Sequence, residues 1–86
     1  MIQILHEPIS VSLTYNHKSR EVRPIAVYWS GRNYPVLKVG LRHTYLRGMT
    51  RHHVFSVVSN QLFFRLNLNT DNLAWTLEEV SDGLPD

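Results

Sequence analysis

Residues 9–15 read Ile-Ser-Val-Ser-Leu-Thr-Tyr. Apolar side chains alternate with Ser and Thr over this whole stretch. Successive side chains of a β-strand point to opposite faces, so this alternation predicts a strand with one buried and one solvated face. The polar residues 16–20 that follow predict a turn.

Similar strand patterns recur along the rest of the chain at short spacing. We expect further strands at 24–30, 34–45, 52–59, 62–68 and 73–80. The last stretch is ambiguous, because Leu73, Leu77 and Val80 also fit one face of a helix that Asp71 would cap. A strand is favoured there, since Trp75 and its Thr neighbour prefer pleated surfaces.

Turn residues separate these stretches. Gly31 and Asn60 can adopt the positive φ that a tight hairpin turn requires. Gly40 falls inside the long stretch 34–45 and predicts a bulge or a bend. Residues 47–51 form a basic loop around Gly48.

Six strands with short links predict a mostly β fold. We expect one domain over 1–86, built as a small antiparallel SH3-like barrel or a strongly bent meander of five to six strands. A two-layer sheet with one short terminal helix is the alternative. Trp29 and Trp75 are expected in the core, Asn67 is expected to face water, and 81–86 is expected to be a frayed acidic tail.

The composition narrows the possible chemistry. The chain has no Cys, which excludes disulfides, thiolate zinc sites and cysteine nucleophiles. No signal peptide and no apolar run of about 18 residues is visible, so a cytoplasmic location is expected. The five His show no HExxH or His-x-His spacing, and adjacent His52 and His53 would point to opposite faces of a strand. With no G-x-S-x-G elbow and no Gly-rich phosphate loop, we expect no metal, no cofactor and no catalytic activity.

The charges are distributed unevenly. Residues 8–70 contain nine basic side chains and one acid, Glu21, whereas residues 71–86 contain five acids and no base. A basic body with interleaved tyrosines is typical of small barrels that hold phosphates on cations and stack bases on aromatic rings. The sequence therefore favours a single-stranded nucleic-acid-binding module, whose expected contacts are Arg32, Tyr34, Lys38, Arg42, Arg47 and Arg51. Strand parity places Lys38, Tyr34 and Arg42 on one exposed face.

The alternative is a protein-interaction module or a homodimer. Small β domains often pair through an exposed sheet edge, and the long stretch 34–45 is the edge expected to do so.

The middle and C-terminal parts of the chain resemble a known family. The turn Trp29-Ser30-Gly31-Arg32-Asn33-Tyr34 is followed by a hydrophobic pattern at Val36, Val39, Phe55, Val57, Phe64, Leu66, Trp75, Leu77 and Val80. This pattern resembles a small bacterial β domain that occurs alone or beside proteins of translesion DNA synthesis. The resemblance implies a DNA-maintenance protein as a partner and implies no activity.

Overall fold

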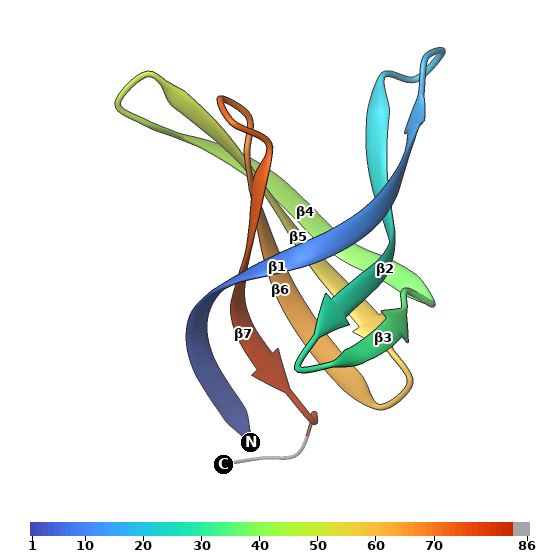
Figure 1. Cartoon of the computed structure of the whole chain (residues 1–86). Helices are drawn as coiled ribbons and strands as arrows, with labels where there is room; N and C mark the ends of the chain where they lie inside the picture. Colours follow the sequence, from blue (N-terminus) through green and yellow to red (C-terminus); the bar gives the residue numbers. More distant parts are fainter. Residues whose placement is uncertain (84–86) are drawn as a thin grey trace.

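The computed structural model describes residues 1–83, which form seven antiparallel β-strands and no helix (Figure 1). The mostly β prediction is therefore confirmed, and the last element is a strand. The strands are β1 (Ile2–Asn16), β2 (Glu21–Trp29), β3 (Arg32–Pro35), β4 (Lys38–Arg47), β5 (Thr50–Ser59), β6 (Leu62–Asn69) and β7 (Ala74–Ser81).

The strands make one strongly curled sheet with the order β3-β2-β1-β7-β6-β5-β4. Alternation places one face of each strand on the inside of the curl, where the core lies. Phe55 and Val57 of β5 meet Phe64 and Leu66 of β6 there, and all four are buried. Val27 of β2 is buried in the same cluster, so the curl brings both halves of the sheet onto one core.

The curl depends on two places where the chain changes its hydrogen-bonding partner. The first half of β1 pairs with β7 and its second half pairs with β2. Between β3 and β4 the chain crosses from β2 to β5: the Val36 amide donates to the Ile25 carbonyl at 2.9 Å, and the Leu37 amide donates to the Val58 carbonyl at 2.8 Å. Bends and bulges of this kind allow one strand to pair with different neighbours along its length, so that the sheet can curl.

The crossing closes the curl at one end only. Within residues 1–83, no backbone pairing joins the β2 residues 21–24 to β4. The turns β1–β2, β4–β5 and β6–β7 all lie at this open end, at the top of Figure 1, with the β1–β2 turn across the gap from the other two. The turns β2–β3 and β5–β6 lie at the opposite, closed end, in the lower half of Figure 1.

The short turns follow the expected chemistry. Trp29 pairs with Arg32 across a two-residue turn in which Ser30 and Gly31 both have positive φ. Ser59 pairs with Leu62 across a second such turn, where Asn60 has a φ of 54°. The predictions for Gly31 and Asn60 are confirmed.

Several details of the prediction need correction. The stretch 34–45 belongs to two strands, because the crossing at residues 36–37 interrupts it. Leu73 lies in the β6–β7 turn with a φ of 60°, exposed, and not on the core face of the last strand. Asn67 is buried, because its amide is held by side chains of three neighbouring strands.

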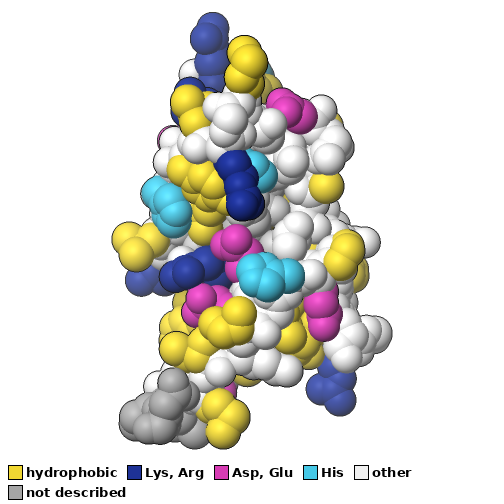
Figure 2. Space-filling model, turned by 90° about the vertical axis from the view of Figure 1, so that its left-hand side faces the viewer, with side chains coloured by type: hydrophobic (Ala, Val, Ile, Leu, Met, Phe, Trp, Pro, Cys, Tyr) yellow, Lys and Arg dark blue, Asp and Glu magenta, His cyan; other side chains and the backbone are white. Residues whose placement is uncertain are grey.

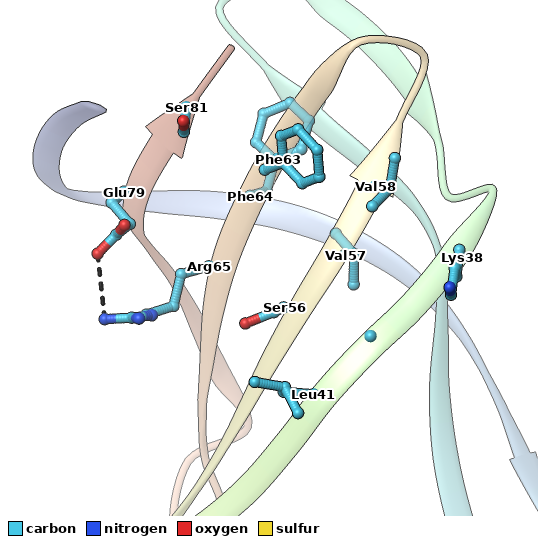
Figure 3. A pocket seen from close by; sticks show the side chains of 11 residues that line it. Lys38, Leu41, Ser56, Val57, Val58, Phe63, Phe64, Arg65, Glu79 and Ser81 are labelled. Atoms are coloured by element: carbon cyan, nitrogen blue, oxygen red, sulfur yellow. Dashed lines mark ion pairs between the residues drawn. The ribbon is translucent and has the colours of Figure 1, made fainter. Parts of the chain in front are cut away.

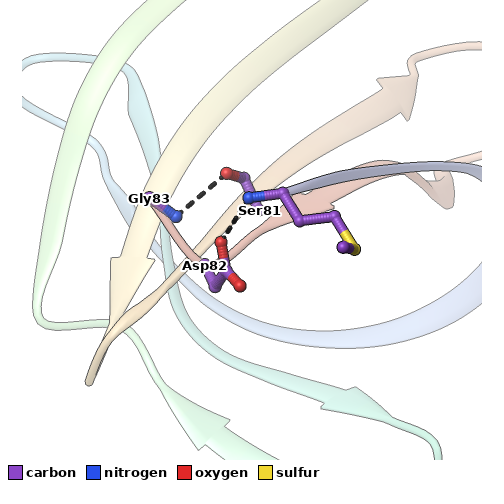
Figure 4. A network of polar contacts seen from close by, with 4 residues as sticks. Ser81, Asp82 and Gly83 are labelled. Atoms are coloured by element: carbon purple, nitrogen blue, oxygen red, sulfur yellow. Dashed lines mark hydrogen bonds and ion pairs between the residues drawn. The ribbon is translucent and has the colours of Figure 1, made fainter. Parts of the chain in front are cut away.

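The two ends of the described chain lie side by side (Figure 4). The amino group of Met1 forms an ion pair with Asp82, and the Gly83 amide donates to Ser81 Oγ at 3.1 Å. These contacts of residues 81–83 differ from the frayed tail that the sequence suggested, and residues 84–86 of that tail lie outside the described part of the chain.

None of the described residues form a helix long and apolar enough to cross a membrane.

Candidate functional site

A cleft of about 540 Å³ occupies the open end of the curl, and residues of four strands and two turns line it. Arg20, Glu21 and Val22 come from the β1–β2 hairpin. Arg42 and Thr44 come from β4, which faces that hairpin across the open gap. The lining also includes His53 and Phe55 of β5, Leu68 of β6 and Leu73 of the β6–β7 turn. The cleft thus combines a cationic rim with an apolar floor.

A β-bulge places Arg42 in this cleft. The register of β4 on β5 shifts between Val39 and Arg42, so that Lys38 pairs with Val58 while Arg42 pairs with Phe55. Paired residues of an antiparallel ladder point to the same face, and Phe55 faces the core. Arg42 therefore lies on the inner face and Lys38 on the outer face. The expected bulge at Gly40 is confirmed, but the expected shared face of Lys38, Tyr34 and Arg42 is wrong, because the bulge inverts the parity.

Arg42 makes two contacts across the cleft. Its guanidinium carbon is 5.5 Å from the centroid of the Phe55 ring, a cation–π arrangement. Its Nη1 is 3.8 Å from Oε2 of Glu21, on the opposite hairpin. This ion pair is long and exposed, so it bridges the open gap only weakly. A stronger anion can compete for Arg42.

His53 lies on the inner face of β5, the same face of the sheet as Arg51 of β5 and Arg42 of β4. Burial lowers the pKa of His53, and the positive charges of Arg51 and Arg42 lower this pKa further. The imidazole is therefore neutral at pH 7. The positive charges of these two guanidinium groups therefore act on the part of the cleft that His53 lines.

The β4–β5 hairpin is held to the β6–β7 turn. The Thr70 amide donates to the Arg51 carbonyl at 3.1 Å, and the Thr70 hydroxyl donates to the same carbonyl at 2.8 Å. The Thr50 hydroxyl donates to Oδ2 of Asp71 at 2.6 Å. These bonds fix the backbone from which Arg47 and Arg51 project.

The six residues expected to bind nucleic acid divide into two groups. Arg42, Arg47 and Arg51 lie towards the open end, on the two strands of the β4–β5 hairpin. Arg32 and Lys38 lie at the closed end, beside the β2–β3 turn and the β3–β4 crossing. Tyr34 is half-buried, with its ring 5.1 Å from that of Phe64 and 6.1 Å from that of Trp29. Its ring is thus engaged by the core margin.

Arg20 and His53 were not among the expected site residues. Arg20 was assigned only to a polar turn, and His53 only to a pair of divergent histidines. That divergence is confirmed: His52 binds Asn67 on the outer face, while His53 lines the cleft. No local signal brings Arg20 to β4, because their approach depends on the curl of the whole sheet.

A second, smaller hollow lies on the outer face of the sheet (Figure 3). Leu41, Val58 and Phe63 give it an apolar lining, and Lys38 lies at its β4 side. The ion pair of Arg65 and Glu79, 3.1 Å between Nη1 and Oε1, closes its β7 side. Both charges of that pair are engaged, so this hollow has less free positive charge than the cleft.

The charges of another face are mixed (Figure 2). Lys and Arg side chains there are separated by Asp, Glu, His and hydrophobic side chains, and the described residues form no continuous basic surface on it. Among the described residues, this face therefore offers no continuous basic surface to a polyanion.

Comparison of the chain with protein-family models, curated proteins and solved structures found no match.

Proposed function

We propose that the open end binds single-stranded nucleic acid. The observation that carries this proposal is the cleft itself, which Arg20 and Arg42 line together with apolar side chains, while the charge of Arg51 acts on His53 in the same lining. Guanidinium groups bind phosphates in a fork geometry, and an apolar recess accepts the face of a base. A duplex offers its bases only at groove edges, whereas a single strand can place a base in the recess.

The proposed contacts differ from those expected from the sequence alone. Arg42, Arg47 and Arg51 are kept and Arg20 is added, because all four belong to the hairpins of the open end. Arg32, Tyr34 and Lys38 are assigned no contact. A role in DNA maintenance, beside a larger enzyme that supplies catalysis, agrees with the resemblance and is part of the same proposal.

The experiment compares two double variants with the same loss of charge. Arg47→Ala/Arg51→Ala removes two cations from the open end, and Arg32→Ala/Lys38→Ala removes two from the closed end. Binding of a fluorescein-labelled oligothymidine is followed by anisotropy at several salt concentrations. We expect the first variant to reduce the slope of log K against log salt by about 1.4, since each phosphate contact on a single strand contributes about 0.7.

The control variant should leave this slope at the wild-type value. Equal slopes for both variants, or an absence of salt-dependent binding by the wild-type protein, would refute the proposal.

A second candidate function is pairing of two copies through β4. This strand ends the sheet order, pairs only with β5, and carries the exposed Leu41 and Leu46. Exposed edges of this kind can pair with another strand. Light scattering after size exclusion tests it: a dimer that Leu41→Glu dissociates supports pairing, and a monomer at every concentration refutes it.

A further inference from the structure

The most exposed large apolar side chain of the described chain is at the tip of the β4–β5 hairpin. Met49 is 98% exposed, although it is flanked by two ordered strands. The turn itself does not require it: Gly48 has a φ of 63° and Met49 has no positive φ, and the second position of such glycine-first turns is usually Asn, Asp or Ser. A Met there leaves a long apolar side chain in water.

Cations lie on both sides of this side chain. Arg47 pairs with Thr50 next to the turn, and Arg51 pairs with Leu46 one position further. Adjacent paired residues face opposite sides of a hairpin, so the two guanidinium groups flank the tip on different faces. An apolar tip between two arginines matches the alternation of bases and phosphates along a nucleic-acid strand.

The hairpin is also held in place before any ligand binds. Thr70 and Asp71 of the neighbouring turn bond to Arg51 and Thr50 at 2.6–3.1 Å. A braced tip loses little conformational freedom when it binds, which lowers the cost of inserting a side chain. Met49 lies five residues beyond Thr44 of the cleft, about 17 Å along an extended strand, so one oligonucleotide can reach both.

We propose that Met49 inserts as an apolar wedge between adjacent bases of the strand bound at the open end. Arg47 and Arg51 hold the phosphates on either side of the separated step. Apolar side chains that unstack base steps in this way are a known device of architectural nucleic-acid-binding proteins. This inference rests on the proposed function and adds the means by which the ligand is deformed.

The probe is a 15-nucleotide single strand with 2-aminopurine between two adenines at its centre, and a fluorescein-labelled strand of the same sequence. The fluorescence of 2-aminopurine rises when the base is unstacked, and anisotropy of the labelled strand measures affinity independently. The variants are Met49→Ala, Met49→Leu and Ile4→Ala. Ile4 is 65% exposed on β1, so its loss controls for removal of an exposed apolar side chain.

We expect the wild-type protein, Met49→Leu and Ile4→Ala to raise the fluorescence. Met49→Ala should bind about fivefold more weakly or worse, with an unchanged salt slope and no fluorescence rise. Salt-dependent binding without a rise in any variant would refute the wedge and leave the proposed function standing. Absence of salt-dependent binding would refute both.

The same tip chemistry also suits an anionic lipid surface, so vesicles of phosphatidylglycerol and phosphatidylcholine are the competing probe. Binding of the wild-type protein to these vesicles, lost in Met49→Ala, together with no change in 2-aminopurine, would assign the tip to lipid and overturn the wedge.

Discussion

The guanidinium group of Arg42 lies over the ring of Phe55, 5.5 Å from its centroid, and so joins the rim of the cleft to its buried floor. Phe55 is part of the core cluster, and Trp75 packs against it with ring centroids 5.6 Å apart. Arg42 is therefore positioned by the core, while its charge faces the open gap. This relationship exists only because the bulge at Gly40 turns Arg42 inward.

Two replacements of Arg42 should distinguish the contribution of its charge to binding from that of its planar guanidinium group. Arg42→Lys keeps the charge but loses stacking and the fork of donors, so we expect weaker binding of the oligonucleotide with an unchanged salt slope. Arg42→Ala should weaken binding and reduce the slope by about 0.7, the contribution of one phosphate contact on a single strand. Because the cation–π contact and the ion pair with Glu21 are partly exposed, the free energy of unfolding should change by less than about 1 kcal/mol.

Anisotropy titrations at four salt concentrations and urea unfolding measure these two effects. Arg32→Ala is the matched control, since it removes an arginine from the closed end. A slope in Arg42→Ala equal to that of the wild-type protein would contradict the assignment of Arg42 to a phosphate.

The environment of His53 predicts a pH dependence of stability. Its pKa is lowered in the folded protein by burial and by Arg51 and Arg42, whereas in the unfolded chain it is about 6.5. Below that value the unfolded chain binds more protons than the folded protein does. The contribution of His53 to stability is therefore complete above about pH 6.5 and is lost as the pH falls from there through the folded pKa. Urea unfolding of His53→Gln should show a smaller loss over this interval.

Binding should depend on pH in the opposite direction. A phosphodiester near His53 favours the imidazolium form, and it does not itself titrate in this range, so affinity should increase from about pH 8 to about pH 5.5. The facing charges that define this balance are Arg42, Arg51 and Glu21. His53→Gln should flatten the profile, and His6→Gln, on an exposed part of β1, should not. A profile that is flat in the wild-type protein would exclude His53 from the ligand.

The alternation of side chains was enough to predict most of the sheet. In β5 and β6 the predicted and observed strand bounds agree within two residues. Phe55 and Val57 lie on the opposite face of β5 from Val54 and Val58, as predicted. The alternation of side chains between two faces is a local property of each strand, so it does not depend on how the strands are arranged. The same reasoning failed at Arg42, because one bulge inverts the parity of everything beyond it.

The site depended on information that no local pattern contains. Arg20 and Arg42 are 22 residues apart, and only the one-sided closure of the curl brings their strands to the same cleft. Asn67 was predicted to face water from its parity, which correctly placed it on the outer face. Its burial arises from the long side chains of Tyr45, His52 and Glu78, which cover it there.

The two tryptophans should differ in their effect on stability. Trp75 is buried against Phe55, so Trp75→Ala should cost about 3–5 kcal/mol, enough to remove the cooperative melt of a small domain. Trp29 is half-buried, edge-on to Phe64, with its Nε1 donating to Glu7 at 2.9 Å. We expect Trp29→Ala to cost about 2 kcal/mol and to keep a cooperative melt. Circular dichroism melts distinguish the two, and equal losses would contradict the difference in burial.

The buried side-chain amide of Asn67 should contribute to the stability of the fold. Its Nδ2 donates to Tyr45 Oη at 2.9 Å and to Glu78 at 3.2 Å, and its Oδ1 accepts from His52 Nδ1 at 2.9 Å. Asn67→Ala leaves these partners partly unsatisfied, so we expect a loss of about 1–3 kcal/mol in urea unfolding. Asn33→Ala, at an exposed position of β3, should change stability little. A neutral Asn67→Ala would mean that water replaces the amide without cost.

Replacement of Ser59 by Ala should instead raise stability, because it removes a buried polar group. Its side chain is fully buried at the end of β5, and its Oγ has no hydrogen-bond partner among the described residues. A buried hydroxyl without a partner costs about 1–3 kcal/mol, and Ala has nearly the same volume without that cost. We therefore expect Ser59→Ala to raise the free energy of unfolding by about 1 kcal/mol, while Ser56→Ala, at the half-buried outer hollow, stays near the wild-type value. Destabilisation by Ser59→Ala would instead indicate that a bound water satisfies the hydroxyl.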